Sequence, residues 1–240
     1  MFQYLIDMLY PIRCPVCREI VVPKGQRICV GCREKLKLIE EPRCKKCSKP
    51  VEEEEEEYCS DCLRKNFHYV RGYALWVYDA VMKESMADFK YRNKKEYARF
   101  YVEELLFHYG ETIKKLSFDA LVPVPIHRSK YRLRGYNQAA VLAGGIGKEL
   151  GIPVLNELLI RVKKTLPQKQ LNDRERLKNL QEAFQMNSKA ADSFGKELNR
   201  VLLVDDIYTT GSTIEACTGI LQEHGVKEVY FMTVCIGKGY

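Results

Sequence analysis

The sequence lacks any long hydrophobic run. Its opening, MFQYLIDMLYPIRC, is apolar but short and contains Asp7, and it has neither a basic start nor a small-residue cleavage site. We therefore expect neither a signal peptide nor a membrane insertion, and we expect a cytoplasmic protein. A strong charge of one sign is also missing, since the net charge is +7, which permits an anionic partner without requiring one. The 240 residues, 46% of them hydrophobic and 30% charged, suit one ordinary soluble domain plus a smaller module.

Cysteines are concentrated at the front of the chain. Eight of the ten lie in the first 62 residues as four C-x-x-C pairs, whose first members are each 15 residues apart. A two-residue gap lets both thiolates reach one tetrahedral Zn²⁺, so four pairs supply ligands for two structural ions. Disulfides are disfavoured without a secretion signal. Neighbouring pairs close the shortest loops, which favours the following tetrads over a cross-braced pairing: Cys14/Cys17/Cys29/Cys32 and Cys44/Cys47/Cys59/Cys62.

The purpose of this zinc module, residues 1–65, stays open between two alternatives. About 60 residues with few large apolar side chains need metal in order to fold, which supports a purely structural role. The other alternative is a nucleic-acid-binding ribbon. The module carries 13 Lys and Arg against 12 Asp and Glu, a net of +1. The acidic run at residues 52–57 would repel a phosphate backbone and is typical of a solvated hairpin tip.

Behind the module, residues 66–240 alternate between strand and helix patterns. They are predicted to form an α/β domain with a mainly parallel sheet and flanking helices. Two helices are predicted over residues 81–108, broken near Arg92 and Asn93. Trp76, Cys217 and Cys235 fall in apolar patterns and are predicted to be core residues. Strands are predicted at residues 73–79, 118–125, 201–204 and 230–236.

The most informative stretch is VLLVDDIYTTGSTI, residues 201–214. Four apolar residues run into Asp205 and Asp206, whose carboxylates can accept hydrogen bonds from two vicinal hydroxyls or hold a hydrated Mg²⁺. A hydroxyl-rich turn then opens a helix that ends at Gly225, with Ser212 and Glu215 as a predicted capping box. Backbone N–H groups at such a helix start suit a phosphate. The turn consists of Thr209, Thr210, Gly211, Ser212 and Thr213.

A basic cluster follows the predicted strand at residues 118–125. Two prolines force an extended exit from this strand, and the next residues, HRSKYRLRGYNQ, are predicted to form a loop before a helix that begins near Asn137. Arginines offer bidentate donors to phosphate oxygens, so the loop suits a diphosphate, although an ordinary basic surface loop is the alternative. Its position after a parallel strand favours the diphosphate. The cations are Arg128, Lys130, Arg132 and Arg134.

Residues 201–214 resemble the ribose-phosphate signature of the type I phosphoribosyltransferases. The resemblance implies that Asp205 and Asp206 face the ribose hydroxyls of phosphoribosyl pyrophosphate (PRPP), bound with Mg²⁺, and that residues 209–213 wrap its 5-phosphate. In that case Gly211→Val is expected to abolish PRPP binding without unfolding the domain. The basic loop becomes the pyrophosphate loop of the same pocket, through Arg128, Arg132 and Arg134.

The polar segment at residues 161–179 lies between a helix and a strand, where the wider phosphoribosyltransferase family has a flexible lid that closes over PRPP. A solvated linker is the alternative. The predicted lid residues are Lys163, Lys164, Gln168 and Arg176.

Three motifs together resemble the ComF family of competence and DNA-utilisation proteins over nearly the whole chain. They are VPVPIHRSKYRLRGYNQAAVLA, RVKKTLPQKQLNDRERLKNLQEAF and the C-x-x-C front end. The resemblance implies a double zinc ribbon fused to a phosphoribosyltransferase-type domain, PRPP or a nucleotide-like ligand, and the handling of single-stranded DNA during natural transformation. It also implies partners among other competence proteins, such as a helicase, and it implies little about catalysis.

Two functions follow from these resemblances. The first is DNA handling, in which the pocket binds Mg²⁺-PRPP or a nucleotide end as a ligand or regulator. The second is an active phosphoribosyltransferase with an unknown nucleobase or amine acceptor. The chain shows no acceptor-specific hood and no N-terminal cysteine nucleophile, which favours the first function. Because Tyr131 and Tyr136 lie among and beside the arginines, the basic loop suits single-stranded DNA, and we predict that DNA and PRPP compete there.

Overall fold

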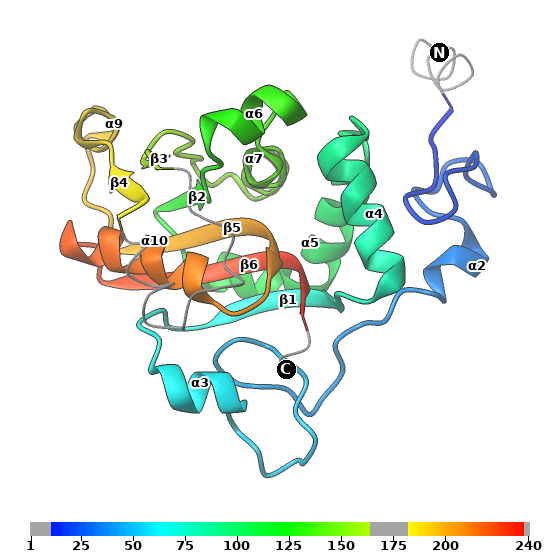
Figure 1. Ribbon diagram of the computed structural model, residues 1–240, viewed down its shortest axis with the longest axis horizontal. Helices are drawn as coiled ribbons and strands as arrows, with labels where there is room; N and C mark the ends of the chain where they lie inside the picture. The colour runs from blue at the N-terminus through cyan, green and yellow to red at the C-terminus, as the bar shows by residue number, and fades with distance from the viewer. Residues whose placement is uncertain (1–10, 164–181, 238–240) are drawn as a thin grey trace.

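The computed structural model describes residues 11–163 and 182–237, and a parallel sheet lies at its centre (Figure 1). The four strands follow the order β1-β6-β5-β2, and every neighbouring pair is parallel. Their apolar residues are buried on both faces, as expected for a parallel sheet that is covered on each side. The predicted α/β class is therefore confirmed. The strands are β1 (Gly72–Val77), β2 (Ala120–Pro123), β5 (Arg200–Tyr208) and β6 (Glu228–Ile236).

Helices on one face share an apolar cluster with the sheet that includes Trp76, Met86 and Leu142. The predicted break near Arg92 and Asn93 is confirmed, since Asn93 adopts φ +53° between the first two of these helices. No helix in the described ranges is both long and apolar enough to span a bilayer. The helices on this face are α4 (Ala80–Tyr91), α5 (Tyr97–Leu116) and α7 (Gln138–Leu150).

The opposite face of the sheet is covered by α10 (Ser212–Glu223) and by a small antiparallel pair, β3 (Leu159–Arg161) with β4 (Phe184–Met186). Ile214, Cys217 and Leu221 of α10 are buried in this second cluster. The short helix α9 (Ser188–Phe194) follows β4 (Figure 1). Cys217 and Cys235 are fully buried, so their predicted place in the core is confirmed.

The basic segment predicted as a loop is wrong in one respect, because it contains a helix, α6 (Arg128–Arg134). The His127 side chain accepts a hydrogen bond from the Ser129 N–H and caps the start of the helix. Gly135 ends the helix at φ +78°, with its N–H bonded to the Tyr131 carbonyl. The prolines before it fix only the exit from β2, so the residues that follow are free to form a helical turn.

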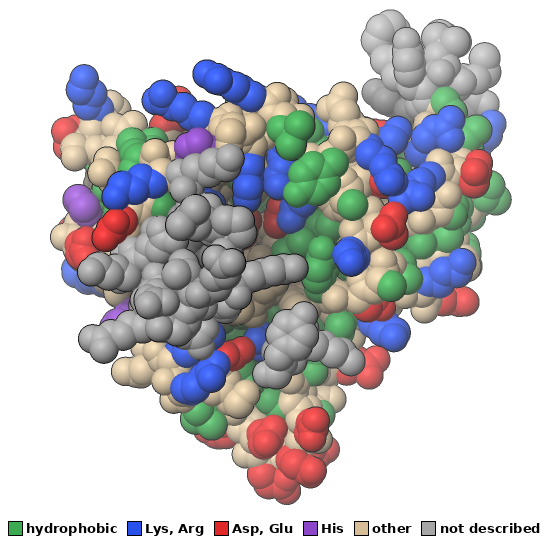
Figure 2. Space-filling view, viewed as in Figure 1, with side chains coloured by type: hydrophobic (Ala, Val, Ile, Leu, Met, Phe, Trp, Pro, Cys, Tyr) green, Lys and Arg blue, Asp and Glu red, His purple; other side chains and the backbone are tan. Residues whose placement is uncertain are grey.

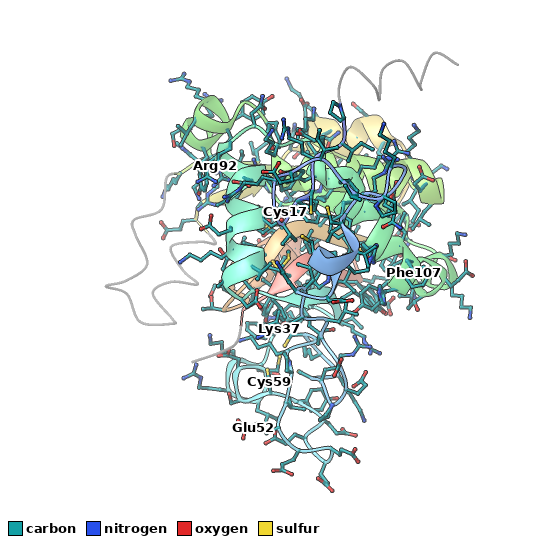
Figure 3. All side chains as sticks on the ribbon, turned by 90° about the vertical axis from the view of Figure 1, so that its right-hand side faces the viewer. Cys17, Lys37, Glu52, Cys59, Arg92 and Phe107 are labelled. Atoms are coloured by element: carbon teal, nitrogen blue, oxygen red, sulfur yellow. The ribbon has the colours of Figure 1, made fainter. Side chains whose placement is uncertain are left out.

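The cysteine-rich front end forms two small units, which pack on opposite sides of the sheet. The first ribbon (residues 11–36) contains α2 (Val30–Arg33) and contributes Cys14 and Cys32 to the α4–α5 side. The second ribbon (residues 40–65) contains α3 (Ser60–Lys65) and joins the α10 side. Figure 3 shows Cys17 beside α4, Cys59 below the sheet, and Lys37 between them.

The segment between the two ribbons crosses the free edge of β1. The Ile39 N–H donates to the Leu75 carbonyl, and the Val77 N–H donates to the Lys37 carbonyl, both at 2.9 Å. The segment thus adds an antiparallel bridge to a parallel sheet and covers its edge. Buried Asp88 of α4 anchors the first ribbon, because Arg18 Nε lies 2.6 Å from its Oδ2.

Candidate functional site

Asp205 and Asp206 lie side by side in β5, at the carboxyl end of the sheet. The strand was predicted to end at residue 204, but it continues past both acids because Asp205 pairs with Thr233 of β6. The Asp206 N–H donates to Asp205 Oδ1 at 2.8 Å. Burial, and then the negative charge of Asp206, raises the pKa of Asp205 from its ordinary 3.8 to about 7. Asp205 therefore has too little compensating charge around it to be fully ionised at neutral pH.

Lys90 of α4 forms an ion pair with the second acid, and sequence reasoning missed it. Its Nζ lies 2.8 Å from Asp206 Oδ1, with the two side chains only 15% and 12% exposed. Burial alone would lower the pKa of Lys90, but the charge and hydrogen bond of Asp206 raise it, so the ammonium stays charged. A signal existed in the sequence. Lys90 shares a helical face with Met82 and Met86, where apolar residues are expected.

Two further cations reach this edge from other elements. Lys130 of α6 has an exposed side chain, yet burial of its ammonium group and the nearby charge of Arg161 lower its pKa. Arg161 of β3 lies over the Phe184 ring at 5.0 Å, and burial lowers its pKa as well. Helices α4 and α6 and strand β3 therefore bring positive charge to one pair of acids. The excess of cations suits an anionic ligand.

Residues 209–213 form the turn that opens α10, at the same end of the sheet. Gly211 precedes the helix at φ +80°, a conformation that favours glycine. The Thr210 and Ser212 hydroxyl oxygens lie 3.1 Å apart. Thr209 is exposed and Thr213 is half-buried. The first N–H groups of an α-helix have no intrahelical acceptor, so this turn has the donors that a phosphate requires.

Two expectations about this turn are wrong. Glu215 does not close a capping box with Ser212, because its carboxylate accepts from the His68 N–H at 3.0 Å and also contacts His68 Nδ1. A Cβ on Gly211 would lie 2.4 Å from Tyr208 Oη and 2.7 Å from Phe67 Cζ. Gly211→Val would therefore disrupt the packing beneath the turn, and a selective loss of phosphate binding is not expected from it.

The arginines of α6 have different surroundings. Arg134 donates to Gln138 Oε1 at 2.8 Å and to Tyr91 Oη at 3.0 Å, and its guanidinium stacks over the Tyr91 ring. Arg128 and Arg132 are exposed, and neither forms an ion pair with any residue that the structure describes. Figure 2 shows Lys and Arg side chains gathered along the upper edge of the molecule, where α6 lies in Figure 1.

Only part of the predicted lid can be placed. Lys163 Nζ lies 3.1 Å from a carboxylate oxygen of Glu182, so this ion pair joins the two ends of the chain that flank residues 164–181. Lys164, Gln168 and Arg176 lie outside the described residues.

The eight front-end cysteines form the two predicted tetrads. Within each group, all four sulfur atoms lie within 4.8 Å of one another. Four Zn–S bonds of about 2.3 Å in a tetrahedron place the sulfurs about 3.8 Å apart. The Sγ atoms of Cys17 and Cys29 are 3.9 Å apart, and those of Cys47 and Cys59 are 3.6 Å apart. Both tetrads thus fit a structural zinc ion, and the pairing of neighbours is confirmed.

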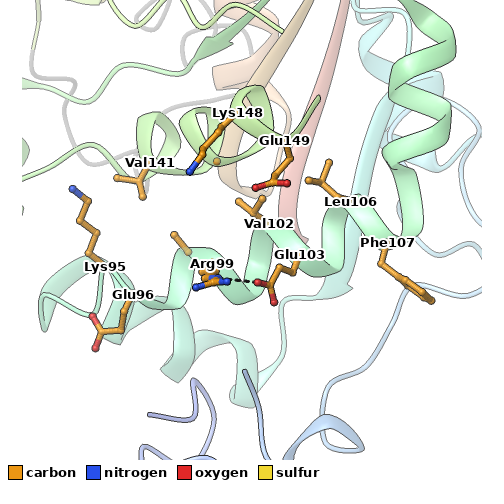
Figure 4. A pocket seen from close by; sticks show the side chains of 12 residues that line it. Lys95, Glu96, Arg99, Val102, Glu103, Leu106, Phe107, Val141, Lys148 and Glu149 are labelled. Atoms are coloured by element: carbon orange, nitrogen blue, oxygen red, sulfur yellow. Dashed lines mark hydrogen bonds and ion pairs between the residues drawn. The ribbon is translucent and has the colours of Figure 1, made fainter. Parts of the chain in front are cut away.

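A separate groove of about 1080 Å³ lies between α5 and α7 (Figure 4). Its floor includes Val102 and Val141, and charged residues such as Arg99 and Glu103, which pair at 2.9 Å, line its rim. None of the predicted ligand residues lines this groove. The acids, the turn and α6 form a different site, at the carboxyl ends of β2 and β5.

Comparisons with known proteins cover both parts of the chain. Residues 5–63 match the double zinc ribbon domain, and residues 138–239 match the phosphoribosyl transferase domain. The chain is 28% identical over 228 residues to competence protein F of Haemophilus influenzae, covering 92% of this chain and 95% of the relative. It is 30% identical over 208 residues to competence protein ComFC of Streptococcus pneumoniae, covering 84% of each chain. DNA utilization protein YhgH of Salmonella typhimurium is 26% identical over 233 residues, with 94% and 97% covered.

Proposed function

The chain belongs to the ComF family of competence and DNA-utilisation proteins, and from this premise we propose that it binds the Mg²⁺ complex of PRPP, or a related ribose phosphate, at the carboxyl edge of its sheet. We further propose that it takes part in handling single-stranded DNA during natural transformation or DNA utilisation. Its C-x-x-C thiols suit the reducing cytoplasm, where we place this activity.

The observation that carries the ligand proposal is the arrangement of β5. Two carboxylates and a phosphate-type turn follow one another within nine residues of the chain, 205–213. Asp206 already has a cation in Lys90, whereas the high pKa of Asp205 marks a carboxyl that lacks partners. Two ribose hydroxyls, or the water shell of a Mg²⁺ ion, would supply donors to it. The same acids therefore fit the ribose and metal, and the turn fits the phosphate.

Calorimetric titration of Mg²⁺-PRPP into the zinc-loaded protein tests this proposal. Asp205→Ala removes one acceptor for the ribose, and hydrogen bonds to charged groups are each worth about 1.5–3 kcal/mol, so the affinity is expected to fall roughly tenfold to a hundredfold. Asp192→Ala on exposed α9 is the matched control and is expected to bind like the unchanged protein. Equal affinity in the Asp205 variant, or no heat with the unchanged protein, would refute the assignment.

Phosphoribosyl transfer is the alternative function, and the same pocket supports it. Pyrophosphate release from PRPP, measured across a panel of nucleobases and amines, distinguishes the two. Release that depends on one acceptor, and that is lost in Asp205→Ala, would establish transfer. Binding without release for every acceptor supports a ligand or regulatory role.

Helix α6 is the proposed contact for single-stranded DNA. Arg128 and Arg132 are exposed on it, and Tyr131 between them is 54% exposed, which suits cations on a backbone with a ring on a base. Because α6 also approaches the acids, DNA and Mg²⁺-PRPP are expected to compete. Labelled single-stranded DNA is titrated with and without saturating Mg²⁺-PRPP. An unchanged DNA affinity would refute the shared site and point to the zinc module or to another partner protein, such as a helicase, as the route to DNA.

A further inference from the structure

We propose that the second ribbon positions the turn at residues 209–213, so that zinc in the second tetrad and a phosphate in the turn stabilise each other. The inference rests on the proposed function, because it takes this turn to be the phosphate site. It is carried by the contacts that residues 65–69, the segment that leaves the second ribbon, make with β5, the turn and α10.

A chain of polar groups joins the second tetrad to the strand end that holds the turn. Tyr69 Oη lies 3.9 Å from Cys62 Sγ and 2.8 Å from Tyr208 Oη. Tyr208 is the last residue of β5, and Thr209 follows it directly. A zinc-bound Cys62 thiolate accepts hydrogen bonds and cannot donate them, so Tyr69 donates to it and Tyr208 donates to Tyr69. Metal binding thereby sets the direction of both hydrogen bonds.

Aromatic packing holds the turn from beneath. The Tyr69 ring stacks on Phe67 with centroids 5.1 Å apart, and the Tyr208 ring stacks on Phe231 at 4.8 Å. The backbone of Gly211 rests on this group, since even a Cβ there would come within 2.7 Å of Phe67. The turn therefore has no space to shift toward the ribbon, and it would lose that support if the Phe67 and Tyr69 rings moved.

Polar contacts tie the same segment to the helix start. The buried carboxylate of Glu215, in the first turns of α10, accepts the His68 N–H and contacts the His68 ring. Lys65 Nζ lies 3.4 Å from the Thr210 carbonyl oxygen. One short segment of the front end thus contacts the strand end, the turn and the helix whose N–H groups would hold the phosphate.

The first ribbon offers an internal control. Its contacts with the domain lie on the other side of the sheet and include the ion pairs of Arg18 with Asp88 and of Arg33 with Glu104. Zinc in the first tetrad is therefore expected to be independent of a ligand in the turn. Binding linkage is reciprocal, so a phosphate that depends on the second tetrad must in turn stabilise the zinc there.

The test uses the full chain loaded with zinc. The protein is equilibrated with increasing chelator, with and without saturating Mg²⁺-PRPP, and the thiols that become free are alkylated and located by mass spectrometry. PRPP is expected to raise the chelator concentration that empties the second tetrad by at least about fivefold, the lower end of usual coupling factors. The first tetrad is expected not to change, and it also reveals any direct chelation of zinc by PRPP.

Two conservative variants separate positioning from general stability. Tyr69→Phe keeps the ring but removes the hydroxyl between the tetrad and Tyr208. Tyr101→Phe is the matched control, because Tyr101 is equally buried and its hydroxyl bonds Ser85 at 2.7 Å in the α4–α5 layer. Tyr69→Phe is expected to reduce the PRPP effect on the second tetrad to less than about twofold, while Tyr101→Phe keeps the full effect.

Amide hydrogen exchange of residues 209–213, measured without ligand, distinguishes failure of the coupling from failure of the proposed function. Faster exchange in Tyr69→Phe than in Tyr101→Phe is expected. If calorimetry shows that PRPP binds but the second tetrad releases zinc at the same chelator concentration as before, the coupling is refuted and the proposed function stands. If PRPP does not bind at all, the proposed function fails, and the exchange comparison alone decides whether the ribbon positions the turn.

Discussion

Asp205→Asn is expected to make the protein more stable while it weakens ligand binding. In the folded chain, burial and the neighbouring Asp206 raise the pKa of Asp205 to about 7. The folded state therefore holds a proton that the unfolded chain releases above about pH 4. Stability falls as the pH rises between these two values and is flat above the upper one. An asparagine has no proton to lose, so the variant avoids this cost.

The magnitude follows from the two pKa values. Each pKa unit corresponds to about 1.4 kcal/mol, so a rise from 3.8 to about 7 corresponds to about 4 kcal/mol at neutral pH. Asp205 is partly accessible to solvent, which screens the interaction, and we expect about 2 kcal/mol. For a domain of this size that gain raises Tm by about 4–8 °C.

Asp206→Asn is the matched control, and the opposite sign is expected. It leaves the ammonium of Lys90 without its partner in a site where both side chains are mostly buried. Breaking such a pair costs about 3–5 kcal/mol, and relief of Asp205 returns part of this, so a net loss of about 1–3 kcal/mol is expected.

Thermal unfolding in zinc-containing buffer from pH 5.5 to 8 measures both variants against the unchanged protein. Only the difference between variant and parent is used, so zinc loss at acid pH cancels. The advantage of Asp205→Asn should be largest at pH 7 and above and should shrink as the pH falls. A lower Tm for Asp205→Asn, or an advantage that does not vary with pH, would show that the acid pair does not carry the strain inferred for it.

Three further predictions concern the cations and the metal. Lys90→Met removes the ammonium beside Asp206, so Mg²⁺-PRPP binding should require more Mg²⁺, as calorimetry at graded Mg²⁺ will show; an unchanged Mg²⁺ requirement would contradict the role of the pair. Elemental analysis of protein purified without chelator should return two zinc ions per chain, and one ion, or none with disulfides, would contradict the tetrads. Replacing Arg128 and Arg132 with Ala should reduce the salt slope of single-stranded DNA binding by about 1.4, measured by anisotropy at graded salt, whereas an unchanged slope would move the DNA contact away from α6.

The parts of the fold that were predicted correctly depend on local patterns. The buried run at residues 201–204 identifies β5, and the regular C-x-x-C spacing identifies the two tetrads. The helix break at Asn93 follows from a polar pair within an amphipathic pattern. Each of these features is decided by neighbours within about one helical turn or one loop, so a single sequence contains the information.

The parts that were missed depend on distant partners. Glu215 has the spacing of a capping box, but a buried carboxylate takes the strongest donor available, and His68 lies 147 residues away along the chain. Gly211 resembles a phosphate-loop glycine, yet its required conformation and its contact with Phe67 belong to the interface with the second ribbon. The ion pair of Lys90 with Asp206 joins α4 to β5 in the same way. No local pattern specifies such pairs.

The charges of the two ribbons bear on where DNA would bind. In the second ribbon, residues 52–57 are six exposed glutamates at its outer tip, and its inner side is covered by β5 and β6. In the first ribbon, Arg18, Arg27 and Arg33 already pair with carboxylates of α4 and α5. The arginines that would track a phosphate backbone are therefore neutralised in one ribbon and opposed by glutamates in the other. Arg128 and Arg132 of α6 are exposed without such partners among the described residues, and this balance favours α6 over the zinc module as the DNA contact.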